Sequence, residues 1–297
     1  MGYRQVVIRK CDKLKAKDNQ LVIEKEKEIK KVPLEDINYI LLEDNTCTIT
    51  GKLISELGNF GICLITCNDK HEPSTIMYPY NHHYKQLEVL EQQLVMTEVL
   101  KEELWQEIVK SKIKNQIITL ERTTKDEKTI KKLYEYYDEV ELHDKTNREG
   151  LAAKIYFRSL YGSEFIRFYD DAINAALNYA YAIIKSAITR LLAVYGLNTY
   201  LGIKHKSKTN NFNLCYDLIE PYRAIIDEYI YEYKNDITYP LSPEFRTKLV
   251  NLLNKEIICE NKKCTIEYSI ELLVKSYIKS IKNNKVFLSF PKIVTYE

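Results

Sequence analysis

Two carboxylates and one histidine in the second half of the chain have the residue types of a divalent-metal site. Glu149 lies in the segment NREGLAAKIYFRSLYG, and His205 and Glu220 lie in GIKHKSKTNNFNLCYDLIEPYRAIID. Carboxylate oxygens are the ligands that Mg²⁺ prefers, and an added imidazole also suits Mn²⁺. A bound divalent ion polarises a phosphoryl oxygen and activates water or a 3′-hydroxyl for attack. These residues therefore indicate metal-dependent phosphodiester chemistry, if the fold brings them together.

Glu149 stands in the first turn of a helix that the sequence predicts from residue 147 to 161. It lies three residues before Ala152 and seven before Tyr156, which places it on or beside the apolar face of that helix. A carboxylate beside a packed face is costly unless it is paired or binds a metal. From this segment alone, the simpler interpretation is a first-turn glutamate that interacts favourably with the helix dipole.

His205 lies in a polar stretch, with Lys204, Lys206 and Lys208 around it. Charged residues such as these are almost never fully buried, so a histidine among them does not fill a core. It is either a solvated surface residue or part of a site that also binds phosphate.

Asp217 and Glu220 are three residues apart, which puts both carboxylates on one helical face, and Arg223 lies one turn further along. Carboxylates at this spacing repel each other and need a cation, which either Arg223 or a metal ion supplies. The alternative from this segment alone is a surface cluster of three charged residues.

The charge of the whole chain does not reveal a nucleic-acid ligand, because 44 Lys+Arg nearly cancel 42 Asp+Glu and leave a net charge of +2. Two stretches, however, are locally basic. Residues 201–213 hold three lysines and no acid, and residues 272–296 hold five lysines and no acid. Lys275, Lys279 and Lys282 share one face of a predicted helix. A solvated face explains the second stretch alone, whereas both stretches together favour a phosphate-binding surface.

The elements that must position these residues fall into two parts. Residues 1–78 are rich in short β-branched segments and turn residues, which predicts a small β-sandwich-like domain. Its expected strands are Tyr3–Arg9, Gln20–Glu24, Ile37–Leu42, Cys47–Thr50 and Ile62–Thr66, with a short helix at Lys52–Leu57. After a linker at about 77–84, residues 84–297 predict a large all-α domain that carries the site. The expected fold class is therefore α+β.

Apolar residues recur at helical intervals through the second part. The expected helices are 84–122, 125–139, 147–161, 165–196, 214–231, 243–255 and 264–283. The longest apolar stretch, 172–197, is interrupted by Asn174, Asn178, Lys185 and Arg190, so it does not predict a membrane span.

The seven cysteines predict reduced thiols, because their number is odd and the chain opens without an apolar signal segment. Cys63/Cys67 and Cys259/Cys264 do not have the usual spacings of zinc ligands. We therefore expect a soluble, cytoplasmic protein.

Two segments resemble the CRISPR-associated integrases and endonucleases that acquire new spacers. The first, REGLAAKIYF, is similar to the glutamate-bearing helix of that family at Glu149, Ala153, Tyr156 and Phe157. The second, IKHKSKTNNFNLCYDLIEPYR, is similar to its second motif at His205, Asp217, Leu218, Glu220, Pro221 and Arg223. Both motifs occur in the expected order, and the wording of the second resembles the type II-A version of the family.

The resemblance implies a role for each matching residue. Glu149, His205 and Glu220 would be the catalytic ligands of Mg²⁺ or Mn²⁺, and Asp217 would orient the site without binding the metal. Arg223 and the lysines at 204, 206 and 208 would contact DNA phosphates, as Lys275, Lys279 and Lys282 would on the basic helix face. Many relatives carry Asp where Glu220 stands, and the longer side chain should still reach a metal.

The resemblance also implies partners. The family's proteins form homodimers through the β-domain, and a dimer of a small ferredoxin-like Cas protein bridges two such dimers. The assembly holds a prespacer duplex whose 3′-hydroxyls attack the edges of a CRISPR repeat. A ring-forming accessory protein and the effector nuclease would join in a type II-A setting. The alternatives are a stand-alone nuclease or transposon-type integrase of the same chemistry, and a DNA-end-binding scaffold without activity.

Overall fold

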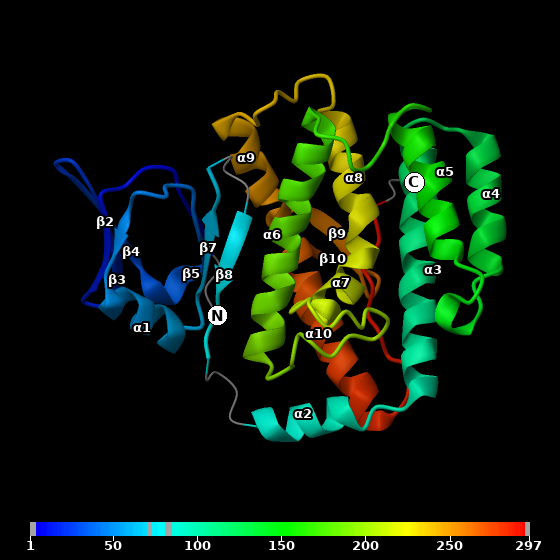
Figure 1. Ribbon diagram of the computed structural model, residues 1–297, viewed down its shortest axis with the longest axis horizontal. Helices are drawn as coiled ribbons and strands as arrows, with labels where there is room; N and C mark the ends of the chain where they lie inside the picture. Colours follow the sequence, from blue (N-terminus) through cyan, green and yellow to red (C-terminus); the bar gives the residue numbers. More distant parts are fainter. Residues whose placement is uncertain (1–3, 70–72, 81–84, 295–297) are drawn as a thin grey trace. The chain divides into compact units, whose positions relative to one another are not determined.

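The computed structural model describes residues 4–69, 73–80 and 85–294, and Figure 1 shows its elements. The chain forms two compact units. The first contains Met1–Leu87 and Arg190–Leu197, and the second contains Glu88–Thr189 and Asn198–Glu297. The expected division into 1–78 and 84–297 stays a prediction, and part of its linker, residues 81–84, lies outside the described residues.

The first unit contains a four-stranded sheet in the order β1-β5-β7-β8. Its strands are β1 (Arg4–Ile8), β5 (Ile37–Leu42), β7 (Cys63–Cys67) and β8 (Pro73–Met77). Strand β5 pairs in parallel with both β1 and β7, whereas β8 runs antiparallel to β7. All residues of β5 (INYILL) are buried, and all but Asn38 are hydrophobic, as expected of a strand that is paired on both sides and covered on both faces.

A second four-stranded sheet has the order β4-β3-β2-β6. It consists of β2 (Lys13–Lys17), β3 (Gln20–Lys25), β4 (Glu28–Pro33) and β6 (Thr48–Ile49), and helix α1 (Gly51–Asn59) follows it. The turn between β2 and β3 uses Asp18 and Asn19, both at positive φ (50° and 56°), as tight hairpins prefer. Leu14, Leu21 and Leu53 belong to one buried cluster of this unit. The expected β-rich N-terminal part is confirmed.

The second unit is mostly helical, as expected. Its helices, with the short 3₁₀ helices η2 to η4 between them, are α2 (Gln86–Leu94), α3 (Glu98–Arg122), α4 (Glu127–Asp138), η2 (Leu142–Asp144), α5 (Arg148–Tyr161), α6 (Ala172–Val194), α7 (Asn213–Ile219), η3 (Glu220–Tyr222), α8 (Arg223–Glu232), α9 (Pro243–Val250), η4 (Asn251–Asn254) and α10 (Ile266–Asn283). Helix α3 packs against η3 and α8 and also against α4 and α5, which lie beside it in Figure 1. In the described part of the chain, no helix is long and apolar enough to cross a bilayer.

Helix α3 carries polar side chains into the interior of the unit. The amide of Asn115 donates to the carbonyl oxygens of Pro221 and Pro291, each at 2.9 Å. The hydroxyl of Thr119 donates to the carbonyl oxygen of Ala224 at 3.2 Å. These bonds satisfy buried polar groups and fix α3 against η3, the start of α8 and the segment after α10.

The helical unit differs from the expected all-α domain in one element, an antiparallel pair of strands. Strands β9 (Glu256–Cys259) and β10 (Lys262–Thr265) form a hairpin between the expected helices 243–255 and 264–283. Its turn uses Glu260 and Asn261 at positive φ (49° and 60°). Four-residue strands are too short for their alternation to stand out from the helical pattern around them.

Two expected helices are also shorter than predicted. The expected helix 84–122 is interrupted before Thr97, whose side chain caps the N-terminus of α3 by accepting from the backbone N–H of Leu100. The expected helix 165–196 begins only at Ala172, after a segment that opens with Gly162 at φ 107°. That segment contributes to the candidate site.

The expectation of reduced thiols is wrong for one pair, because Cys11 and Cys47 form a disulfide with a Cα–Cα distance of 5.5 Å. Sequence spacing could not reveal it, since 36 residues separate the two cysteines. The remaining five cysteines are free, and Cys63, Cys67, Cys215 and Cys259 are buried.

We expect Ile40→Ala to lower the free energy of unfolding by about 2–5 kcal/mol, because the residue is fully buried in β5. The matched change Ile29→Ala alters the edge strand β4, where the side chain is 60% exposed, and should cost less than about 0.5 kcal/mol. Urea unfolding followed by circular dichroism checks both values. Equal costs would contradict the place of β5 in the core.

Candidate functional site

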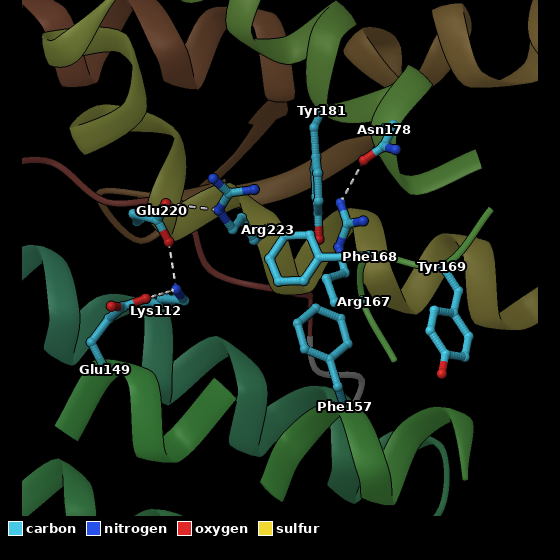
Figure 2. A pocket seen from close by; sticks show the side chains of 10 residues that line it. All are labelled: Lys112, Glu149, Phe157, Arg167, Phe168, Tyr169, Asn178, Tyr181, Glu220 and Arg223. Atoms are coloured by element: carbon cyan, nitrogen blue, oxygen red, sulfur yellow. Dashed lines mark hydrogen bonds and ion pairs between the residues drawn. The ribbon is translucent and has the colours of Figure 1, made fainter. Parts of the chain in front are cut away.

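Glu149 and Glu220 meet at the ammonium group of Lys112 (Figure 2). Lys112 Nζ donates to Glu149 Oε1 and, at 2.5 Å, to Glu220 Oε2. The side chains of Lys112 and Glu220 are each 6% exposed, and that of Glu149 is 28% exposed. The three residues come from α3, α5 and η3, so the fold brings together carboxylates that are far apart in the sequence.

A buried aspartate holds the start of α5 and with it Glu149. Asp144 accepts hydrogen bonds from the backbone N–H of Arg148 (2.8 Å) and of Glu149 (3.1 Å). These are N–H groups that the first turn of a helix cannot satisfy by itself. The helix position before Arg148 is taken by Asn147 in the left-handed conformation, without a side-chain cap. Asp144 therefore caps α5 from outside the usual position, which is why sequence reasoning missed it.

Two cations keep Glu220 ionised. Arg223 Nε donates to Glu220 Oε1 at 2.7 Å, on the opposite carboxylate oxygen from Lys112. Burial alone would raise the pKa of Glu220, but Arg223 and Lys112 outweigh it and hold this pKa at about 2. Burial lowers the pKa of Lys112, but the charges of Glu220 and Glu149 outweigh burial and raise this pKa above its usual value. The cluster thus contains two negative and two positive groups.

Asp217 organises the loop that carries His205. Its fully buried carboxylate accepts from the backbone N–H groups of Ile203 (2.5 Å), Lys204 (3.2 Å) and His205 (3.1 Å). It also lies 2.7 Å from His205 Nδ1. A Cβ atom on Gly202 would come within 2.2 Å of the His205 carbonyl oxygen, so the loop needs glycine there.

The Asp217–His205 contact shifts both groups. The hydrogen bond that the imidazole donates to Asp217 raises the pKa of His205, although partial burial opposes it. Burial raises the pKa of Asp217 in spite of the contacts with His205. Because Nδ1 faces Asp217, Nε2 is the ring nitrogen that remains for another partner.

The structure joins the two carboxylates through Lys112, and His205 lies near enough for their charges to add to the effect of Asp217 on the pKa of its imidazole. Glu149 and Glu220 line a cavity of about 410 Å³, whereas His205 lines a second cavity of about 490 Å³ with Lys206 and Lys208. Among the described residues, no three His, Cys, Asp or Glu side chains lie in a metal-binding arrangement. The cluster nevertheless fits a cation, because Lys112 already places a positive charge between two carboxylates, and oxygen ligands suit Mg²⁺ or Mn²⁺.

The first cavity also contains cationic and aromatic side chains that the sequence analysis missed (Figure 2). Arg167 donates to the side-chain oxygens of Asn174 (3.0 Å) and Asn178 (2.8 Å). The guanidinium groups of Arg167 and Arg223 lie 5.2 and 4.7 Å from the ring centre of Tyr181. Phe168, 94% exposed, lines the same cavity. Arg167 was missed because it falls inside the expected helix 165–196.

The side chains expected to contact DNA phosphates differ in whether their charged groups already bind other groups of the protein. Lys204 Nζ donates to the His143 carbonyl oxygen at 3.1 Å, and Arg223 is held by Glu220, so both have a structural role. Among the rest, Lys206 pairs with Glu98 at 3.2 Å, Lys275 pairs with Glu271 at 2.8 Å, and Lys208, Lys279 and Lys282 are exposed. The expected basic face of α10 is therefore a solvent-facing surface.

The comparisons with known proteins concern the family and the fold of the chain. The model of the family "CRISPR associated protein Cas1" matches residues 6–248. The chain is 36% identical to the CRISPR-associated endonuclease Cas1 of Neisseria meningitidis serogroup C over 298 residues, covering 99% of this chain and 97% of the relative. A casposase bound to an integration product has a similar fold, with a TM-score of 0.78, 18% identity and coverage of 95% and 92%. A Cas6-RT-Cas1–Cas2 complex also matches, with a TM-score of 0.78, 20% identity and coverage of 95% and 35%.

The buried Asp227, bound by the hydroxyl of the cavity residue Tyr181, gives a prediction for the pH dependence of stability. Burial raises its pKa from 3.8 to about 6, although the hydroxyl of Tyr181 donates to it. Between about pH 4 and pH 6 the folded protein therefore keeps a proton that the unfolded chain has released. In this range the carboxyl of Asp227 lowers the free energy of unfolding as pH rises. Above about pH 6 its destabilising contribution no longer changes with pH. Relative to the wild type, Asp227→Asn should gain roughly 2–3 kcal/mol of stability between pH 4 and pH 7.5.

Urea unfolding at the two pH values measures this difference. The matched change Asp138→Asn, at an exposed position of α4, should leave the pH dependence as in the wild type. A wild-type pH profile for Asp227→Asn would contradict the raised pKa.

Proposed function

The chain belongs to the family of CRISPR-associated protein Cas1, and on that premise we propose that it is a metal-dependent DNA endonuclease and integrase. Its proposed reaction inserts new spacers into a CRISPR array. One observation carries this proposal: Glu149 and Glu220 converge on a single buried positive charge at the wall of a cavity lined by two arginines. The relative from Neisseria meningitidis, named an endonuclease and matched over nearly its whole length, supports it.

Glu149, Glu220 and His205 would hold Mg²⁺ or Mn²⁺, with His205 contributing Nε2. The ion, when bound, supplies a Lewis acid that activates the attacking oxygen and stabilises charge on the phosphate. Because His205 lines a different cavity from the carboxylates, a small movement of its loop is part of this proposal. Asp217 would keep the imidazole oriented through that movement, since it already binds both the ring and the backbone of the loop.

The remaining residues of the cavity would position the DNA. Arg223 keeps Glu220 ionised and stacks on Tyr181, so its charge stays at the wall of the cavity. Arg167, held by Asn174 and Asn178, adds a second guanidinium that suits a phosphate oxygen. A planar guanidinium that is already oriented loses little conformational entropy when it binds phosphate.

The proposed substrate is a prespacer duplex, whose 3′-hydroxyl attacks a phosphodiester at the edge of a CRISPR repeat. One phosphorus–oxygen bond forms and one breaks, so the number of phosphodiesters is unchanged and the displaced 3′-oxygen takes up the proton. With water in place of the 3′-hydroxyl, the same site would cleave DNA. A stand-alone nuclease would perform only this second reaction, and a transposon-type integrase would join DNA without a CRISPR repeat.

The proposed partners follow from the family. Homodimers would form through the first unit, and a dimer of the small ferredoxin-like Cas partner would bridge two of them. The Cas1–Cas2 complex among structures of similar fold supports such a partner. A type II-A setting, with its ring-forming accessory protein and effector nuclease, remains a prediction from the second motif.

Strand transfer of a labelled duplex into a plasmid with a CRISPR repeat tests the reaction. We expect joining at the repeat edges with Mn²⁺ or Mg²⁺ and the small Cas partner, and none with EDTA. Glu149→Gln, Glu220→Gln and His205→Ala should each reduce it on the order of 100-fold or more, because each removes a proposed ligand. The matched control Glu135→Gln removes an exposed carboxylate that pairs with Lys132, and should retain full activity.

Each other outcome identifies a different function. Metal-dependent cleavage of branched DNA without joining would favour the stand-alone nuclease, and joining without preference for the repeat would favour the transposon-type integrase. Binding of DNA ends with neither reaction would favour the scaffold. A variant that keeps wild-type activity would remove its residue from the proposed ligands.

The exposed lysines of α10 provide a separate prediction. The double change Lys279→Glu and Lys282→Glu should weaken DNA binding and reduce the slope of log affinity against log salt by roughly 0.9 for each phosphate that the variant no longer neutralises. Lys27→Glu with Lys30→Glu, at exposed positions of the first unit, changes the net charge equally and serves as control. Unchanged binding of the α10 variant at low salt would leave this surface without a DNA-binding role. Fluorescence anisotropy at several salt concentrations measures both variants.

A further inference from the structure

Lys112 contacts both of the carboxylates that the proposed function assigns to metal binding. Its ammonium donates to Glu149 Oε1 and Glu220 Oε2, and its side chain is only 6% exposed. Lysine is almost never buried unless it is paired, so this position has a specific cause. No motif in the sequence analysis included Lys112.

The charges of the cluster balance only because of this lysine. Glu149 and Glu220 carry two negative charges, and Lys112 and Arg223 carry two positive ones. Removing Lys112 would leave two carboxylates facing each other with only Arg223 to offset them. Removing one partner from a buried ion cluster is strongly unfavourable, because the remaining charge is uncompensated.

We propose that Lys112 is a positioning residue that occupies the place of the metal ion in the free protein and must release the carboxylates for the ion to bind. This inference rests on the proposed function for the assignment of Glu149 and Glu220 as ligands and, in its second arm, for the binding of DNA at this cavity. The ammonium holds the two carboxylates at a common point, so the site is preorganised. The same contact makes Lys112 a competitor, because its positive charge and a divalent ion repel each other in a poorly solvated space.

The cavity offers Lys112 a second partner. Lys112 lines the same cavity of about 410 Å³ as Glu149 and Glu220, so its ammonium can turn from the carboxylates toward that space. A DNA phosphate there would replace the broken ion pair with another charged hydrogen bond. DNA should therefore favour the released lysine, and metal and DNA should bind with positive coupling. The free protein would hold the metal weakly, and the complex with DNA would hold it tightly.

Mn²⁺ affinity measured by the electron paramagnetic resonance signal of free Mn²⁺ tests this inference. Lys112→Gln should bind Mn²⁺ about tenfold more tightly than the wild type in the absence of DNA, within the usual range of coupling between ligands. Lys112→Arg, which keeps the charge, should bind like the wild type. Lys110→Gln removes the same charge from a half-buried position two residues away on α3, and should also bind like the wild type.

The second arm adds a duplex with 3′-dideoxy ends, which cannot be joined. It should tighten Mn²⁺ binding to the wild type by about tenfold and to Lys112→Gln far less, because that variant has no ammonium to release. Equal tightening in both proteins would overturn the coupling. Unchanged or weaker Mn²⁺ binding by DNA-free Lys112→Gln would overturn the competition.

Lys112→Gln leaves two carboxylates underpaired, so its folding is checked by circular dichroism with and without Mn²⁺. Should it not fold, the double variant Lys112→Gln with Glu149→Gln is compared with Glu149→Gln alone. The double variant keeps the charge balance, and the inference requires it to bind Mn²⁺ about tenfold more tightly than the single one. Equal affinities would overturn the inference. Since none of these readouts uses strand transfer, loss of the proposed integrase activity and failure of this inference are distinguished.

Discussion

The structure of the site depends on one constraint, that a carboxylate in the interior must contact a cation or accept several hydrogen bonds. Glu220 meets this constraint twice, with Lys112 on one oxygen and Arg223 on the other. Each of these cations then has a second function in the surrounding structure. Lys112 links Glu220 to Glu149, and Arg223 extends over Tyr181, whose hydroxyl binds the buried Asp227. A chain of charged contacts therefore runs from α5 through α3 to α6 and α8, and each contact supports the next.

Helix α3 is the element that makes these contacts possible. Along one side it presents Lys112, Asn115 and Thr119 to segments more than a hundred residues further along the chain. The loop of His205 is organised separately, around the carboxylate of Asp217 and the close approach at Gly202. The two parts of the site are thus stabilised by different buried carboxylates. This separation explains how the imidazole can lie in another cavity while both carboxylates are already positioned.

Sequence reasoning proposed those residues of the candidate site that follow regular spacing. Glu149 and Glu220 were recognised from helical position and motif, and the orienting role expected of Asp217 agrees with its hydrogen bonds to the His205 loop. Lys112 was missed because it is one of several lysines in a long, highly charged helix, and only tertiary packing shows that it is buried. Asp144 was missed because it caps α5 from outside the standard position.

In the fold, too, only the elements with a clear local sequence pattern could be predicted. Strand β5, in which every residue but Asn38 is hydrophobic, was predicted with correct bounds. The polar strands β2 and β4 and the hairpin of β9 and β10 were not, since half-exposed or very short strands carry little pattern. The disulfide between Cys11 and Cys47 depends on a spatial proximity that composition does not encode.

The two hydrogen bonds of Asn115 have a consequence for the order in which the protein matures. One of its acceptors is Pro291, 176 residues further along the chain. Because a chain is synthesised from its N-terminus, every helix from α3 to α10 exists before Pro291 does. The interior of α3 is therefore completed only after residue 291 has been made, and until then the amide of Asn115 lacks one of its two acceptors.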